Sequence, residues 1–227
     1  MMHRIVILAL LIQPALVEAA GPLVPMDNDS STLDFSLRFA RTKTPLDYAN
    51  RTHDTTSRWL GVSLREKAGK RVTLGMYGGY AWLTQTNNPV TAGLELDGYH
   101  AGFSLHAILL AGQRASLYGA LEYSYQKVDH KTDVQTVVID WAQPQAQLGV
   151  MLALAQKWRL YGGESYGMID GEERASGSIN HTLSFERGAR SGGFVGLDLN
   201  VESDGYIGIE AQSGLMRGGE IYFKRRF

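Results

Sequence analysis

The sequence contains no cysteine among its 227 residues, which excludes a disulfide framework and thiolate chemistry. It has no excess of one charge, since 22 Lys and Arg face 23 Asp and Glu, so we expect no nucleic-acid partner. Beyond the N-terminus it has no run of 18 apolar residues, so no later segment predicts a transmembrane helix. What it does have is 26 Gly, 11 Tyr and 4 Trp. Glycine together with aromatic residues recurs in β-barrels.

The first 20 residues predict a secretory signal peptide. His3 and Arg4 give a short positive start, residues 5–12 form an apolar stretch, and small residues around Ala19 offer a cleavage site. The apolar stretch is far shorter than the roughly 20 residues of a spanning helix. We therefore expect three parts: a signal peptide over 1–20, a flexible periplasmic lead-in over 21–31, and a mature domain over 32–227.

From Thr32 onward, apolar and polar residues alternate with the period-two pattern of β-strands. In the first such segment, Leu33, Phe35 and Leu37 alternate with polar residues, and the apolar set is the candidate lipid-facing side. The pattern predicts ten strands, near residues 33–40, 57–66, 71–84, 92–110, 114–127, 137–154, 158–170, 192–202, 205–213 and 218–227.

Tight turns alternate with longer connections, notably 42–56, 128–136 and 171–190. An even number of strands with short turns on one side and long loops on the other is typical of an antiparallel, up-and-down transmembrane barrel. Eight strands remain the nearest alternative count. The other alternative is a soluble β-sandwich, which would usually have fewer aromatic residues at its strand ends. The sequence predicts an aromatic girdle at the membrane surfaces, made of Trp59, Trp82, Trp141 and Trp158.

Three irregularities interrupt the alternation. The apolar positions change parity near Asp97 and Gly98, which predicts a β-bulge there. Strict alternation would point Glu164 at lipid, so we expect a second bulge at Gly162 and Gly163. Pro144 cannot donate a backbone hydrogen bond, so we expect weak pairing around it.

The C-terminal segment from Glu220 to Phe227 resembles the last strand of bacterial outer-membrane β-barrel proteins, of the small porin-like and OmpA-like class. That family ends in an aromatic residue with apolar residues alternating back from it, as Ile221, Phe223 and Phe227 do here. Arg225 departs from the pattern. The resemblance implies placement in the outer membrane, contact with its lipids, and these three residues as the signal read by the barrel-assembly machinery.

Charges of both signs fall on the predicted inward positions. A balanced set indicates a neutralised network inside a narrow barrel, since buried charges are tolerated when paired. The alternative is a pore lining or an active site. The predicted lumen charge network comprises Asp34, Arg38, Arg65, Arg71, Glu122, Arg159, Asp198, Glu202, Glu210, Glu220, Lys224 and Arg226.

No catalytic constellation stands out. His181 and Ser184 have opposite strand parity, so they cannot act together on one face. Glu172 and Glu173 fall in the predicted 171–190 loop and His53 in the 42–56 loop, where we expect them to be solvated. We therefore expect a monomeric structural or porin-like protein without metal or cofactor. Two alternatives stay open: an enzyme acting on lipid or peptide, and a surface-loop adhesin or ligand-binding protein.

Overall fold

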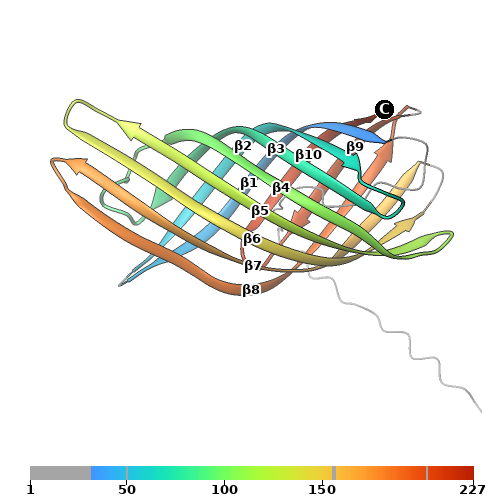
Figure 1. The fold of residues 1–227 in the computed structure, drawn as a ribbon. Helices are drawn as coiled ribbons and strands as arrows, with labels where there is room; N and C mark the ends of the chain where they lie inside the picture. Colours follow the sequence, from blue (N-terminus) through green and yellow to red (C-terminus); the bar gives the residue numbers. More distant parts are fainter. Residues whose placement is uncertain (1–31, 50, 155–156, 203) are drawn as a thin grey trace, which may run out of the picture.

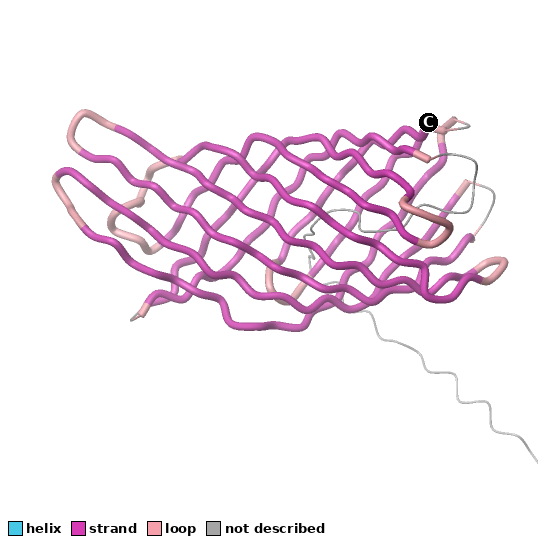
Figure 2. Tube along the Cα trace, viewed as in Figure 1, coloured by secondary structure: helices cyan, strands magenta, loops and turns pink. Residues whose placement is uncertain are grey.

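The computed structural model describes residues 32–49, 51–154, 157–202 and 204–227, and shows a closed antiparallel barrel of ten strands (Figure 1). The predicted signal peptide and lead-in lie outside these residues. Nearly all of the described chain is strand (Figure 2), and within it no helix is long and apolar enough to cross a bilayer. The strands are β1 (Leu33–Tyr48), β2 (Arg51–Lys67), β3 (Val72–Thr86), β4 (Leu96–Ala111), β5 (Ala115–Lys131), β6 (Gln135–Ala153), β7 (Trp158–Gly177), β8 (His181–Asn200), β9 (Gly205–Gln212) and β10 (Arg217–Arg226).

Closure joins the first strand to the last, with pairs running from Asp34↔Arg226 to Lys43↔Arg217. The backbone N–H of Phe227 then donates to the carbonyl of Leu33 at 2.8 Å. The predicted count of ten strands is confirmed. We call the end that carries Phe227 the terminal end, and the opposite end the far end.

The predicted long loops are mostly strand. The 42–56 connection is a hairpin in which β1 reaches Tyr48 and β2 starts at Arg51, and in place of the 171–190 loop only residues 178–180 separate β7 from β8. Figure 1 shows these hairpins and that of β5 and β6 projecting from the far end. Strands of up to 20 residues exceed the 9–11 that cross a bilayer, so the barrel wall continues beyond it.

Both predicted bulges are wrong. Because β4 begins at Leu96, the parity change near Asp97 needs no bulge. Pairing also runs unbroken through Gly163, so Glu164 does face outward, between Leu148 and Gly193. The register shifts lie elsewhere, between Ile108 and Leu110 and between Gly167 and Ile169.

Pro144 lies where the pairing of β6 with β7 is interrupted, because neither Gln143 nor Pro144 has a partner on β7. Its partner on β5, Tyr123, remains in register. The interruption agrees with the weak pairing expected around a residue that has no backbone N–H.

The β9–β10 hairpin is shorter than its neighbours and changes the interior. Beyond its tip, β1 pairs directly with β8 through Asp47↔Glu186 and Tyr48↔Phe185. The tip itself places Leu215 inside the barrel, where this side chain is 4% exposed. The hairpin therefore helps to fill the lumen as well as to close the wall.

Candidate functional site

The interior at the terminal end holds paired charges. Arg65 makes a bidentate contact with Asp34, with Nε at 2.9 Å from Oδ1 and Nη2 at 2.5 Å from Oδ2. Asp198 lies between two cations, with Arg159 Nη2 at 2.7 Å and Lys224 Nζ at 3.3 Å. Burial of these ions is tolerable because each has a partner of opposite sign.

Tyrosines lie above these charges, and each fits over a glycine of the adjacent strand. Tyr222 faces Gly208, and Tyr161 faces Gly196 across the β7–β8 ladder. A Cβ atom at either glycine would overlap the tyrosine ring. The two hydroxyls lie 3.2 Å apart, and Tyr222 donates to Asp198. Glycine is therefore needed here for close approach of an aromatic ring.

A second charged level contains one arginine among three glutamates. Arg38 binds Glu220 in a bidentate contact, with 2.6 Å from Nε to Oε1 and 3.1 Å from Nη2 to Oε2. Glu122 accepts a hydrogen bond of 2.5 Å from Tyr77. One carboxylate oxygen of Glu210 is buried without a hydrogen-bond partner. Arg38 is therefore the cation on which this level depends.

The far half of the lumen contains an apolar cluster, here called the plug, packed among buried polar side chains such as Thr55, Gln85 and Gln126. Between the plug and the glutamates, Arg38 and Glu122 line a residual cavity of about 30 Å³, which holds a water molecule or two. The plug consists of Ala40, Leu46, Tyr48, Trp59, Ala81, Leu83, Leu96, Val128, Val137, Ile139, Trp141, Ile169, Ala175, Phe185, Leu215 and Met216.

A pocket opens at the far end, above the plug, around a buried carboxylate. Glu173 is fully buried and accepts hydrogen bonds from Tyr48 at 2.8 Å and Asn88 at 2.8 Å. His181 Nε2 lies 3.0 Å from its other oxygen. The pocket, of about 290 Å³, is also lined by His53, whose Nδ1 is buried without a partner. We call these residues the mouth site.

Two features of the mouth site bear on its chemistry. Burial, and then the neighbouring Glu173 carboxylate, raise the pKa of Tyr48 well above its ordinary value, so the phenol remains a hydrogen-bond donor. A histidine held by a carboxylate has the orientation that general-base chemistry needs. Within the described residues, no three His, Asp or Glu side chains are grouped to hold a metal.

The outer wall carries a belt of exposed apolar side chains opposite this polar interior. Phe35, for example, is 41% exposed, while its neighbour Asp34 is fully buried. Such an inverted arrangement is stable only when lipid surrounds the barrel. The belt includes Phe35, Leu37, Phe39, Leu60, Val62, Leu64, Leu74, Met76, Phe103, Leu105, Leu121, Leu148, Val150, Val195, Ile209, Ile221 and Phe223.

Comparison with solved structures agrees with the belt. The translocator domain of the autotransporter NalP from Neisseria meningitidis aligns over 88% of this chain and 90% of its own, with 12% identity and a TM-score of 0.53. The outer-membrane protease OmpT from Escherichia coli aligns over 91% of this chain and 100% of its own, with 11% identity and a TM-score of 0.51. The chain has the fold of bacterial outer-membrane β-barrels. No family model and no curated protein sequence matches it.

In this outer-membrane barrel, ten of the twelve residues predicted for the lumen network lie inside. Nine of them form the two charged levels described above, separated by the tyrosines, and the tenth, Arg226, lies 3.4 Å from the Tyr206 hydroxyl. Arg71 and Glu202 were wrongly predicted, because they lie exposed in the β2–β3 and β8–β9 turns, beyond the strands. Strand parity cannot place residues that lie past the end of a strand.

The predicted aromatic girdle needs a similar correction. Trp82 and Trp158 are on the outer wall, as expected, and Trp158 is 41% exposed. Trp59 and Trp141 lie inside the barrel. Trp59 stacks on His100 with ring centroids 5.0 Å apart, and the Arg38 guanidinium lies 4.7 Å from its ring. The girdle prediction rested on the closeness of these residues to strand ends. Strand parity already placed the Trp59 side chain inward and should have taken precedence.

The C-terminal residues of the outer-membrane barrel lie on its lipid-facing side. Ile221, Phe223 and Phe227 are all exposed, and the Arg225 guanidinium lies 5.8 Å from the Phe227 ring. Their recognition by the assembly machinery stays a prediction.

The mouth site was missed by sequence reasoning. Glu173 and His53 were expected to be solvated in loops, yet both are buried on strands. The expectation for His181 and Ser184 agrees with the structure, because His181 reaches the mouth site while Ser184 lies exposed at a position of opposite parity. Strand parity could have predicted the burial of Glu173, because it has the same inward parity as Ile169 on β7.

Glu173→Ala is expected to destabilise the barrel by about 2 to 4 kcal/mol, because the buried Tyr48 and Asn88 and the partly buried His181 lose an acceptor. Urea unfolding in detergent micelles measures the change. Glu172→Ala is the matched control, since its partly exposed side chain points outward and pairs with the exposed Arg174 at 3.2 Å. Equal stability of the two variants would contradict the burial argument.

Proposed function

We propose that this outer-membrane barrel is a closed structural protein that works through its external surface and does not conduct solutes. The observation that carries the proposal is the apolar plug, backed by the two charged levels. An open pore needs a continuous polar lining, whereas the plug places apolar side chains such as Leu46, Ile139 and Phe185 in the lumen, and these cannot hydrogen-bond water. The porin-like alternative would require the plug to move.

Planar-bilayer recording tests this proposal on the folded wild-type protein. We expect no discrete conductance steps, because the residual lumen cavity holds only a water molecule or two. Heat-modifiable migration in SDS gels would confirm that the inserted protein is folded. Reproducible steps from the folded fraction would overturn the proposal.

A second candidate function is hydrolysis at the mouth site, favoured by the Glu173–His181 pair beside the unpartnered His53 nitrogen. Labelled peptides and outer-membrane lipids incubated with the folded barrel would reveal such activity. His181→Ala should abolish it, whereas His130→Ala should not, because His130 contacts the Glu95 carbonyl outside the mouth site. Unchanged substrates with the wild-type protein would remove this candidate.

A further inference from the structure

Four cationic side chains gather on the outer wall where the apolar belt ends. Arg41 and Lys43 project from β1, Arg58 from β2 and Arg217 from β10, and all four are exposed. The register places Arg41 directly opposite Arg58 and Lys43 directly opposite Arg217. Like charges opposite one another destabilise a sheet. We call these four residues the basic collar.

The basic collar has no ion-pair partner in the part of the chain that the structure describes. In the described ranges, no ion pair joins any of the four to a carboxylate. The acidic residues on the same outer face are Asp47 and Asp54. Asp47 is four positions from Lys43 along β1, at about 13 Å, whereas Asp54 is the diagonal neighbour of Lys43 across the β1–β2 ladder, at about 8 Å. The four charges therefore favour an anion supplied from outside.

Other strands of the wall carry the opposite sign. Along the hydrogen-bonded row that contains Arg58, the next three strands contribute Trp82, Asp97 and Asp129. On β6, Asp140 accepts an ion pair from Arg174 of β7. Acidic residues on the outer wall thus gather on β4 to β6, whereas the basic collar lies on β10, β1 and β2.

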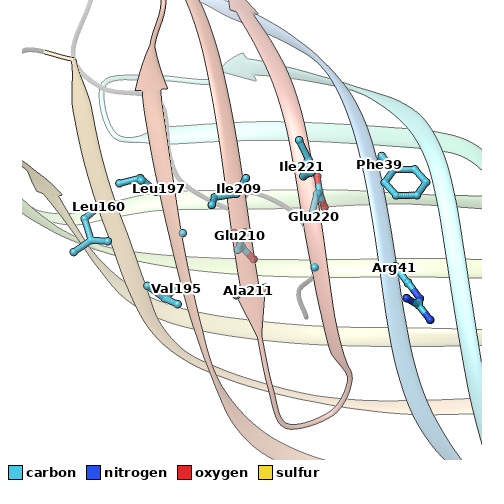
Figure 3. A pocket seen from close by; sticks show the side chains of 12 residues that line it. Phe39, Arg41, Leu160, Val195, Leu197, Ile209, Glu210, Ala211, Glu220 and Ile221 are labelled. Carbon is cyan, nitrogen blue, oxygen red and sulfur yellow. The ribbon is translucent and has the colours of Figure 1, made fainter. Parts of the chain in front are cut away.

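A groove of about 490 Å³ lies in the lipid-facing wall next to the basic collar (Figure 3). The wall is depressed here because the residues paired in sequence across the strands from Arg41 are small. Gly219 pairs with Arg41, and Ala211 pairs with Gly219. Larger side chains on the row toward the terminal end bound the hollow. These are Leu197, Ile209, Ile221 and Phe39. Arg41 therefore places a cation at the edge of a mostly apolar hollow, whose lining also includes the buried Glu210 and Glu220.

We propose that the groove and the basic collar together bind a phosphorylated, multiply acylated glycolipid of the outer leaflet, of the lipid A class. Acyl chains lie in the groove, and headgroup phosphates accept hydrogen bonds from Arg41, Arg58 and their neighbours. Guanidinium groups suit phosphate because they donate in a bidentate geometry.

The dimensions favour this class over a two-chain phospholipid. The groove crosses from β7 to β1, which at about 4.8 Å per strand spacing is about 19 Å and accommodates several chains side by side. The cations span β10, β1 and β2, about 10 Å, which suits more than one phosphate.

The test measures binding of bisphosphorylated lipid A to the folded barrel in detergent by native mass spectrometry. Arg41→Ala/Arg58→Ala should bind about thirtyfold more weakly, because each interfacial cation contributes about fivefold. The control is Lys127→Ala/Arg174→Ala, which removes two cations from β5 and β7, away from the collar, and should bind like wild type. Heat-modifiable migration confirms that every variant is folded.

Two further ligands test separately whether the phosphates and the lipid class determine binding. Dephosphorylated lipid A should bind about as weakly to wild type as lipid A binds to the collar variant. Phosphatidylglycerol should bind more weakly than lipid A. Equal binding of phosphorylated and dephosphorylated lipid A, equal binding of phosphatidylglycerol, or an unaffected collar variant would each overturn the proposal.

Discussion

Arg38→Ala is expected to destabilise the barrel by about 3 to 5 kcal/mol, which is the loss seen when one partner of a buried ion pair is removed. Arg38 is 5% exposed and is the bidentate partner of Glu220. Glu122 and Glu210 lie in the same level, so the substitution leaves three carboxylates together inside the barrel. The guanidinium also loses its contact with the Trp59 ring. Equilibrium unfolding in urea, with the barrel in detergent or liposomes, measures the difference.

Arg174→Ala is the matched control, since it removes an arginine that also contacts two carboxylates, Asp140 and Glu172. The Arg174 side chain is 45% exposed on the outer wall, where water screens the charges. Exposed pairs contribute about 0 to 1 kcal/mol. If Arg38→Ala and Arg174→Ala have similar effects, the three glutamates do not depend on Arg38.

Trp141→Ala should lower stability by about 3 to 5 kcal/mol, because it leaves a cavity inside the apolar plug. Trp141 is 6% exposed and its ring meets Phe185 edge to face at 6.3 Å. The cavity also thins the barrier between the far end and the residual lumen space. Trp141→Ala/Phe185→Ala is therefore expected to show conductance steps that the wild type lacks. Urea unfolding and planar-bilayer recording check the two effects separately.

Trp158→Ala provides the comparison for both measurements. Trp158 is at the start of β7 on the outer wall, so its loss leaves the lumen unchanged and should alter stability by about 1 kcal/mol or less. Conductance from the Trp158 variant, or none from a folded Trp141/Phe185 double variant, would contradict the assignment of the plug as the barrier.

The transmembrane part of the barrel could be predicted closely from alternation. The orientation of residues such as Phe35 and Asp34 is fixed by their chemistry. Only an apolar side chain is stable in contact with lipid, so the polar side chain faces the lumen. The inward charges followed from the same argument, apart from Arg71 and Glu202 in the turns. The C-terminal pattern at Phe223 and Phe227 added the bacterial outer membrane.

Beyond the lipid the same argument fails, since the pattern inverts. Along β1 the outward positions change from Phe39 to Arg41 and Lys43, while the inward positions change from Arg38 to Leu46. Above the belt the outer wall meets water, so the strand takes the usual pattern of a soluble protein. The prediction assumed that a strand ends where its outward residues stop being apolar. For this reason 42–56 was predicted as a loop.

The sequence by itself therefore predicted alternating strands, ten or eight of them, with a lipid-facing and a charged side, because contact with lipid constrains each residue separately. The tertiary structure alone decided which inward residues meet. Closure sets the register between strands, and the register brings Arg38 to Glu220, Tyr222 over Gly208 and Glu173 to Tyr48. It likewise placed Arg41 opposite Arg58 at the edge of the groove. These contacts join residues far apart in sequence, and period-two alternation carries no information about them.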